Sequence, residues 1–191
     1  PSPWYVLAEA SGGANSHLED ALESALSSSG LVTDAVIAQS DTQRAALWKL
    51  REGMSEAQKP EGGSIKHDVS VPINSIPAFM KEGIAAVEKL VPGVRPVPFG
   101  HLGDGNIHFN FTVPKNGDNA AFLARWNEIQ DTVHDIVNRY HGSISAEHGL
   151  GIMKVHEIER YKSAAELDVM RALKRTLDPN NILNPGKVVA I

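Results

Sequence analysis

The sequence predicts an α+β fold of the ferredoxin-like kind, in which a mostly antiparallel sheet carries helices packed on one face. Two observations favour this fold. Helical stripes of apolar residues alternate along the chain with short runs of strand-forming residues. In addition, residues 98–111 read as two strands around Asp104-Gly105, a dipeptide typical of tight hairpin turns. The sheet face opposite the helices is then free for a site or a partner.

Local signals predict each element in turn. Apolar, β-branched or alternating runs predict strands over residues 4–8, 35–38, 65–71 and 143–146. Capping residues and first-turn prolines predict where helices begin: a capping box of Ser16 with Glu19, then Asp41, Pro77, Asp118, and a second box of Ser163 with Glu166. The expected helix ends are Gly30, Met54, Pro92, Tyr140 and Asp178, so the helix that begins at Asp118 is the longest.

Composition limits the classes of function. The chain has 191 residues and 42% hydrophobic content, enough for one domain with a substantial core. Its net charge of -5, without a basic run, argues against nucleic acid as a partner. Because cysteine is absent, any metal must be held by His, Asp, Glu or Asn. No apolar run is long enough to cross a bilayer, and the start at Pro1-Ser-Pro suggests a piece of a longer protein.

The hairpin carries the first candidate site. With Asp104 and Gly105 as a two-residue turn, His101 would lie directly opposite His108, with Cβ atoms roughly 4.5 to 5.5 Å apart. Two imidazoles so placed can hold one metal ion. Asn110 points to the same face as His108, because side chains two apart on a strand share a face. The alternative is a pair of stacked histidines without a ligand, since a metal site normally needs a third protein ligand.

Glu147 is the candidate third ligand, and His148 the candidate base. Adjacent residues on a regular strand point to opposite faces, so both can serve one site only if the chain bends. Gly149 and Gly151 follow directly and permit such a bend. With the two hairpin histidines, Glu147 completes a set of three ligands with an open position. Taken in isolation, this segment is better explained as a surface Glu-His pair in a glycine-rich loop.

The remaining polar residues give weaker signals. Arg51 and Lys66 are candidates for an anionic substrate, because a guanidinium can grip a carboxylate in two-pronged fashion and an ammonium adds a point charge. The alternative for both is an ordinary solvated charge. The glycines do not form a phosphate or dinucleotide loop. Five further histidines are expected to be surface groups: His17, His67, His134, His141 and His156.

Three motifs resemble a known family. They are the segments 98–108 (PFGHLGDGNIH), 145–151 (SAEHGLG) and 177–187 (LDPNNILNPGK). In this order they resemble the C-terminal domain of FAD-linked D-2-hydroxy acid dehydrogenases. That group includes D-lactate dehydrogenase, D-2-hydroxyglutarate dehydrogenase and the glycolate oxidase FAD subunit, within the vanillyl-alcohol oxidase superfamily. The resemblance spans essentially all of residues 1–191, which we expect to form one substrate-binding domain.

The resemblance implies a role for each candidate. His101, His108 and Glu147 would bind zinc or manganese, and His148 would be the catalytic base. Substrate would be bound by Arg51, Lys66, Asn110 and Ser55, where Ser55 stands at the position of a threonine in some members. Asn184 would contact the cofactor. Most of the FAD site would belong to an N-terminal domain that this chain does not include, so the chain alone is expected to be inactive.

The expected reaction of the full-length protein is oxidation of a 2-hydroxy acid to a 2-oxo acid, with hydride transfer to flavin. Expected partners are the small hydroxy acid, the FAD domain, an electron acceptor and, as one option, a second copy in a homodimer. A cytoplasmic location is expected, with peripheral membrane attachment as an option. The alternative from another class is a free-standing metal-binding or metallohydrolase domain that uses the same His, His, Glu set.

Overall fold

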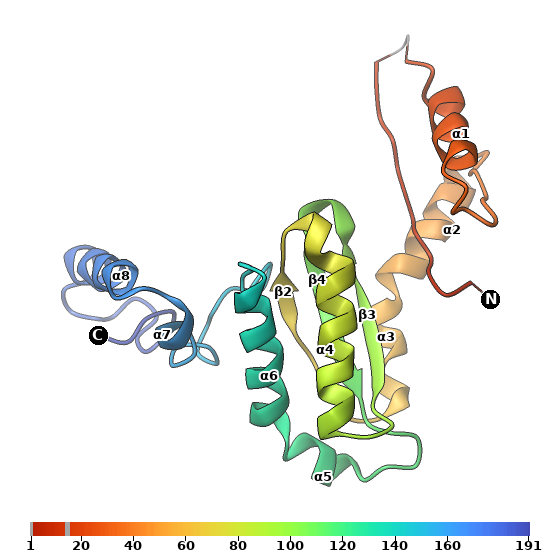
Figure 1. Ribbon diagram of the computed structural model, residues 1–191. Coiled ribbons are helices and arrows are strands. Elements are labelled where there is room, and N and C mark those ends of the chain that lie inside the picture. The colour runs from red at the N-terminus through yellow and green to blue at the C-terminus, as the bar shows by residue number, and fades with distance from the viewer. Residues whose placement is uncertain (1, 14–15) are drawn as a thin grey trace. The chain divides into compact units, whose positions relative to one another are not determined.

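The computed structural model describes residues 2–13 and 16–191. Two compact units divide the chain, with the bounds Pro1–Pro60 and Glu61–Ile191. The first unit contains the helices α1 (Leu18–Ser28), α2 (Asp41–Glu52) and α3 (Met54–Ala57) (Figure 1). The strands expected over residues 4–8 and 35–38 do not form. Trp4 is 63% exposed, and Glu9 is held by the side chains of Arg44 and Trp48 on α2. Strand propensity alone was misleading here, because a strand also needs a neighbour to pair with.

Two of the expected helix starts are shifted. The N-cap of α1 is His17, and the Ser16 hydroxyl donates to the Gly13 carbonyl at 2.5 Å, so the predicted capping box with Glu19 is wrong. The N-cap of α2 is Ser40 instead of Asp41, and its hydroxyl accepts from the Gln43 amide. In both places neighbouring polar residues compete for the same capping position.

The second unit carries the sheet and the helices that cover it (Figure 1). Its strands are β1 (Ser64–Ile65), β2 (Asp68–Ser70), β3 (Arg95–His101) and β4 (Asn106–Thr112). Its α-helices are α4 (Ile76–Leu90), α5 (Asn119–Leu123), α6 (Trp126–Arg139), α7 (Ile158–Tyr161) and α8 (Ala164–Leu177). Short 3₁₀ turns lie at Lys59–Glu61, Ile73–Ser75 and Leu102–Asp104.

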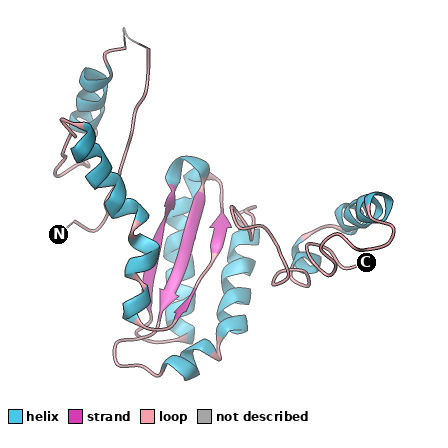
Figure 2. Ribbon diagram, turned by 180° about the vertical axis from the view of Figure 1, so that it is seen from behind, coloured by secondary structure: helices cyan, strands magenta, loops and turns pink. Residues whose placement is uncertain are grey.

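Strand β4 is the centre of the sheet. It pairs antiparallel with β3 along one edge and with both β1 and β2 along the other. Helices α4 and α6 lie together on one face, behind the sheet in Figure 2. The predicted α+β class, with an antiparallel sheet and helices on one face, is therefore confirmed. No helix among the described residues is both long and apolar enough to cross a membrane.

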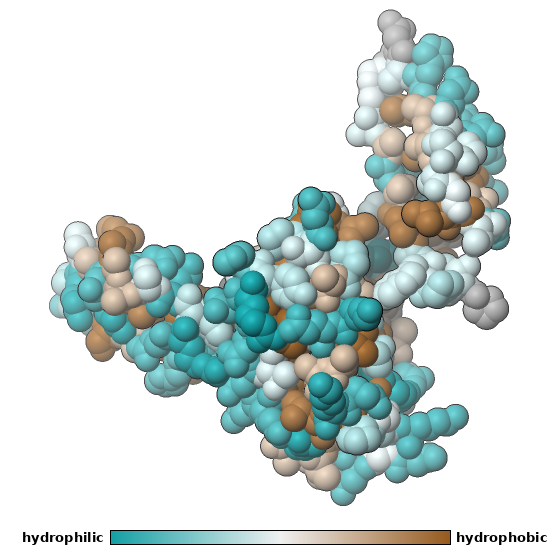
Figure 3. All heavy atoms as spheres, in the orientation of Figure 1, coloured by the Kyte–Doolittle hydropathy of each residue, from teal (hydrophilic) through white to brown (hydrophobic). Residues whose placement is uncertain are grey.

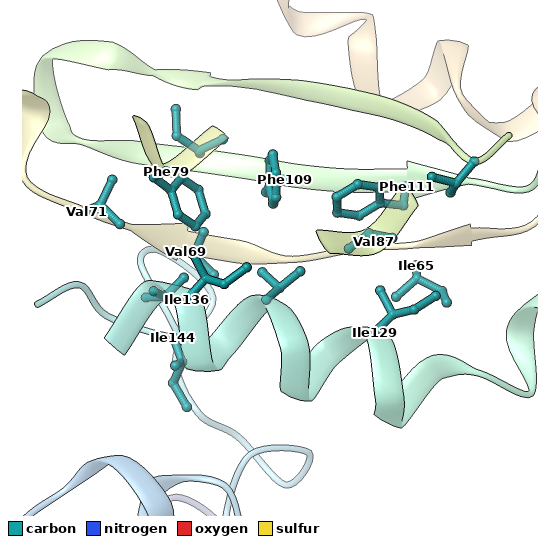
Figure 4. Close-up of a cluster of buried hydrophobic side chains, with 14 of the residues drawn as sticks. Ile65, Val69, Val71, Phe79, Val87, Phe109, Phe111, Ile129, Ile136 and Ile144 are labelled. Carbon is teal, nitrogen blue, oxygen red and sulfur yellow. The ribbon is translucent and has the colours of Figure 1, made fainter. Parts of the chain in front are cut away.

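Alternation along β4 separates the core from the opposite face. Ile107, Phe109 and Phe111 point toward the helices and pack with residues such as Val69, Phe79, Val87, Ile129 and Ile136 (Figure 4). The rings of Phe79 and Phe109 have centroids 4.9 Å apart. The outer surface of these helices is largely hydrophilic (Figure 3), as expected when only one stripe of a helix is apolar.

The strand expected over residues 65–71 is interrupted at Lys66 and His67. Pairs Ser64–Thr112 and Asp68–His108 keep one register, so the interruption does not shift the strand. The Nδ1 atom of His67 contacts the Phe109 carbonyl oxygen at 2.8 Å, while the His67 backbone amide donates to the Asn110 side chain. Side chains thus replace one rung of the ladder.

The helix expected from Asp118 to Tyr140 is two helices, because residues 124–125 form a tighter turn between α5 and α6. An apolar stripe does not distinguish one helix from two in tandem. The predicted Asp118 cap, the Pro77 position in the first turn of α4 and the Ser163–Glu166 capping box are confirmed. The strand expected over 143–146 is reduced to a single bridge between Ser143 and Ser70.

Two histidines expected at the surface are buried instead. His67 is 3% exposed and His134 is 1% exposed, and their rings meet edge to face. Burial lowers the pKa of His67 to about 4 and that of His134 to about 3. His134 also bonds through Nδ1 to the Glu157 carboxylate, whose pKa is raised by burial. The alternation of residues in the sequence does put His67 on the same, apolar face of the strand as Val69.

Replacing His67 with Asn should make stability less dependent on pH. The Asn amide can donate to the Phe109 carbonyl but has no proton to gain. In the wild-type protein, His67 has a pKa of 6.5 in the unfolded chain but of only about 4 when it is buried in the folded protein. The unfolded chain therefore takes up this proton first, and the folded protein loses stability as the pH falls from about 6.5 to about 4. Between about pH 7 and pH 5 this group alone should reduce the free energy of unfolding by about 2 kcal/mol. Chemical denaturation at both pH values should show a loss of stability that is smaller in the variant than in the wild-type protein by about this amount, while the loss due to His134 remains.

The matched control is His141→Asn, which changes an exposed histidine in the left-handed region, where Asn is tolerated. It should keep the wild-type dependence on pH. An identical pH dependence in His67→Asn and the wild-type protein would contradict the assignment of a neutral, buried His67.

Candidate functional site

The hairpin of β3 and β4 differs in register from the prediction. His101 pairs with Asn106, and Phe99 pairs with His108, so the two histidines are diagonal neighbours and not directly opposed. The connection is a 3₁₀ turn closed by Gly105 at φ 70°. It is longer than the expected two-residue turn because residues 102–105 all lie within it. Since the slip is by two residues, both imidazoles still belong to the same face of the sheet.

Glu147 brings the two imidazoles into one cluster. His101 Nε2 lies 3.6 Å from Glu147 Oε1, and His108 Nε2 lies 3.8 Å from Glu147 Oε2. The Asn106 amide also donates to Glu147 Oε1, which orients the carboxylate. Two imidazole nitrogens and one carboxylate suit zinc or manganese. The structure therefore places the three predicted ligands together, on the sheet face opposite the helices.

Asp68 was not predicted as a site residue, yet it lies beneath the cluster. It pairs with His108 across β2 and β4 and is 4% exposed. Its Oδ2 atom accepts from the backbone amides of residues 146, 147 and 148, at 3.2, 2.8 and 2.8 Å. Burial acts to raise the pKa of Asp68, but the hydrogen bonds from the His148 and Glu147 amides, together with the charges of His148 and His108, outweigh it and keep the pKa below its ordinary value. Strand alternation in the sequence already puts Asp68 on the same face as Lys66, a predicted substrate residue, and this could have identified Asp68 as a candidate.

The chain bends at Glu147 and His148 because consecutive amides turn toward the single Asp68 oxygen. Gly149 and Gly151 follow at φ 72° and 54°, a conformation that favours glycine. His148 stacks on His108, with centroids 5.7 Å apart, and its Nδ1 lies 3.7 Å from Asp68 Oδ2. The side chains of Glu147 and His148 thus both lie beside His108.

A second set of ligand-type atoms overlaps the first. Atoms of Asp68, His108 and His148 lie within 4.8 Å of one another. One oxygen of Asp68 already accepts three backbone amides, whereas Glu147 faces the Nε2 atoms of two histidines. Both sets contain His108, and His101, His108 and Glu147 form a donor set that could hold a divalent metal.

The predicted substrate residues are distributed differently. Lys66 falls opposite Asn110 in the register that β1 and β2 share, on the site face, and it is exposed. Asn110 is buried and its Oδ1 accepts the His67 amide at 3.2 Å. Arg51 and Ser55 lie in the first unit, on α2 and α3. Their roles stay predictions.

Asn184, the predicted cofactor contact, lies in the segment that follows α8. It helps to line a surface hollow along α8, together with Leu173 and Val189. Its Oδ1 accepts from the Lys187 ammonium at 3.4 Å. Its role toward a cofactor stays a prediction.

The fold and the cluster define an α+β domain with a histidine and carboxylate site on one face of its sheet. The chain matches the family described as FAD linked oxidases, C-terminal domain, over residues 1–188, and it belongs to this family. The predicted family resemblance is thereby confirmed.

The curated relatives carry dehydrogenase names. The chain is 40% identical to D-2-hydroxyglutarate dehydrogenase of Xanthomonas citri pv. viticola, over 97% of this chain and 40% of the relative. Identity is also 40% to the protein of the same name from Stutzerimonas stutzeri, over 98% of this chain and 41% of the relative. Identity is 37% to the mitochondrial D-2-hydroxyglutarate dehydrogenase of Arabidopsis thaliana, over 97% of this chain and 32% of the relative. The chain thus spans less than half the length of these relatives.

Proposed function

We propose that this chain is the substrate- and metal-binding part of an FAD-dependent D-2-hydroxy acid dehydrogenase, which oxidises a D-2-hydroxy acid to the 2-oxo acid. The convergence of His101, His108 and Glu147 on one sheet face is the observation that carries this proposal. Family membership and the names of the relatives support it. Because those names specify D-2-hydroxyglutarate, a dicarboxylic hydroxy acid is the first substrate to test.

His101, His108 and Glu147 would hold a divalent metal, zinc or manganese. Three protein ligands that leave a coordination position open are typical of catalytic metal sites. A metal bound there supplies Lewis acidity, which makes a coordinated hydroxyl easier to deprotonate. Asn106 supports the site by orienting the Glu147 carboxylate.

His148 would take the substrate hydroxyl proton. Its Nδ1 faces Asp68, so Nε2 is the atom that remains for proton transfer. The side chain is 68% exposed, which leaves the ring accessible to a substrate. The hydride from C2 would be accepted by FAD, which is bound mainly by the N-terminal domain of the full-length protein.

Substrate contacts follow from the same sheet face. Lys66 offers a positive charge in register with Asn110, beside the His108 position. An exposed ammonium suits a substrate carboxylate. The parts that Arg51, Ser55 and Asn184 play stay predictions, as do an electron acceptor, a homodimer and the cytoplasmic or membrane-peripheral location.

The alternative class is a metallohydrolase in which the same ligands activate water. Membership of an FAD-linked oxidase family favours the dehydrogenase. The two classes differ in a direct measurement, because only a dehydrogenase reduces bound flavin when a 2-hydroxy acid is added without an external acceptor.

Replacing Glu147 with Gln should weaken metal binding and flavin reduction together. The amide keeps the shape of the side chain but loses the negative charge that a divalent metal needs. Excess zinc or manganese should restore part of the rate. Metal content and stopped-flow flavin reduction in the full-length, flavin-loaded protein check this, with D-2-hydroxyglutarate as the first substrate. The control is Glu128→Gln on the exposed side of α6; equal metal content in both variants would count against Glu147 as a ligand.

Replacing His148 with Asn should separate proton transfer from metal binding. The variant should keep its metal, while kcat falls by roughly 10² to 10⁴-fold, as is typical for loss of a general base. Added metal should not restore the rate. His141→Asn serves as the control for a histidine outside the site and should behave like the wild-type enzyme. Loss of metal from the His148 variant, or flavin reduction at the wild-type rate, would refute the assignment of the base.

A further inference from the structure

Asp68 divides its two carboxylate oxygens between different tasks. Oδ2 accepts three backbone amides and so anchors residues 146–148 to the sheet. Oδ1 is buried without a hydrogen-bond partner among the described residues, and lies 3.9 Å from His108 Nδ1. A buried carboxylate oxygen is costly to leave unpaired, so a donor is expected to face it.

His108 presents its two ring nitrogens to two carboxylates. Nε2 faces Glu147, and Nδ1 faces Asp68. A neutral imidazole that binds a metal through Nε2 must carry its hydrogen on Nδ1. A carboxylate on the Nδ1 side stabilises that tautomer and fixes the plane of the ring. Asp68 is therefore positioned to stabilise the tautomer of His108 that can bind a metal through Nε2.

His148 repeats the arrangement on the other oxygen. Its Nδ1 lies 3.7 Å from Asp68 Oδ2, and its ring is nearly parallel to that of His108, at an interplanar angle of 28°. A hydrogen held on Nδ1 leaves the Nε2 lone pair available as the base. The proposed ligand and the proposed base thus share one buried partner.

We propose that Asp68 is a positioning residue that fixes the hydrogen on Nδ1 of both His108 and His148. Through His108 it favours metal binding at Nε2, and through His148 it leaves Nε2 able to accept the substrate proton. Its three amide contacts hold the Glu147 and His148 backbone at the distance from the sheet that both tasks require. This inference rests on the proposed function, because it assigns to Asp68 a role in that same site.

Asp68→Asn separates tautomer selection from loop anchoring. The three backbone amides require an acceptor, so the amide oxygen of Asn should occupy the Oδ2 position and keep the loop in place. The amide nitrogen then occupies the Oδ1 position and presents a donor to His108 Nδ1. That donor favours the tautomer with hydrogen on Nε2, which cannot bind the metal without rearrangement.

Zinc affinity of the full-length protein, measured by competition with a chromophoric chelator, should fall by about 10 to 100-fold in Asp68→Asn. At saturating zinc, kcat should return toward the wild-type value, because the amide oxygen at the Oδ2 position still faces His148 Nδ1, and KM for the hydroxy acid should stay close to the wild-type value. Asp178→Asn is the matched control, because Asp178 is 5% exposed and accepts the backbone amides of Ile182 and Leu183 at 2.9 Å. It should retain wild-type zinc affinity.

A second measurement does not depend on the folding of a variant. In the zinc-free wild-type protein labelled with ¹⁵N-histidine, NMR should show hydrogen on Nδ1 of both His108 and His148. Hydrogen on Nε2 of either ring would overturn the proposal for that residue.

The outcomes separate this inference from the proposed function. If the wild-type protein binds zinc and reduces flavin, but Asp68→Asn binds zinc equally well, Asp68 is only a loop anchor and the inference fails alone. Zinc loss as complete as in His108→Ala would make Asp68 a ligand, and an equal loss in Asp178→Asn would show general destabilisation; either result overturns the inference. A wild-type protein that binds no zinc or manganese would overturn both the metal site and the inference.

Discussion

Strand β4 is the constraint on which the second unit depends, because each of the other described strands pairs with it. The pleat gives this strand two chemically different faces. Ile107, Phe109 and Phe111 enter the core beneath α4 and α6, whereas His108 and Asn110 point the other way. A single strand therefore fixes both the packing of the helices and the platform of the site. A one-residue slip of its pairing would exchange the two faces.

The Asp68 carboxylate extends that constraint to a loop distant in sequence. It lies on the strand beside His108 and accepts amides from residues 78 to 80 positions further along the chain. The acceptor lies on the sheet and the donors lie on the loop. The backbone of Glu147 and His148 is therefore held in a fixed position relative to the strand that carries His108. In the proposed reaction, which depends on the relative positions of a metal ligand and a base, this common attachment matters more than the individual contact energies.

Features that depend on residues close together in the sequence were predicted correctly. The Asp118 cap, the Ser163–Glu166 box and the alternation of β4 depend on residues a few positions apart, and the structure confirms them. The convergence of His101, His108 and Glu147 was also predicted, although the expected turn was too short. It survived that error because a slip by two residues preserves the face of the sheet.

Features that depend on distant partners were missed. Nothing near Asp68 in the sequence indicates that it binds the backbone of residues 146–148, and nothing near His134 indicates that Glu157 covers it. The segment at Trp4 has strand-forming residues but no pairing neighbour within its unit as described, so propensity alone could not decide its conformation. Burial of His67 could have been predicted, since the pleat already placed it with the core residues.

The central claim is that the sheet face holds a metal between His101, His108 and Glu147, with Asp68 behind them. Anomalous X-ray scattering from zinc in crystals of the full-length protein tests it most directly, because the signal identifies the element and gives its position. The account predicts a peak about 2.0 to 2.2 Å from Nε2 of both histidines and from a Glu147 oxygen, with Asp68 outside the coordination sphere. A peak coordinated by Asp68 and His148, or none on this sheet face, would contradict it.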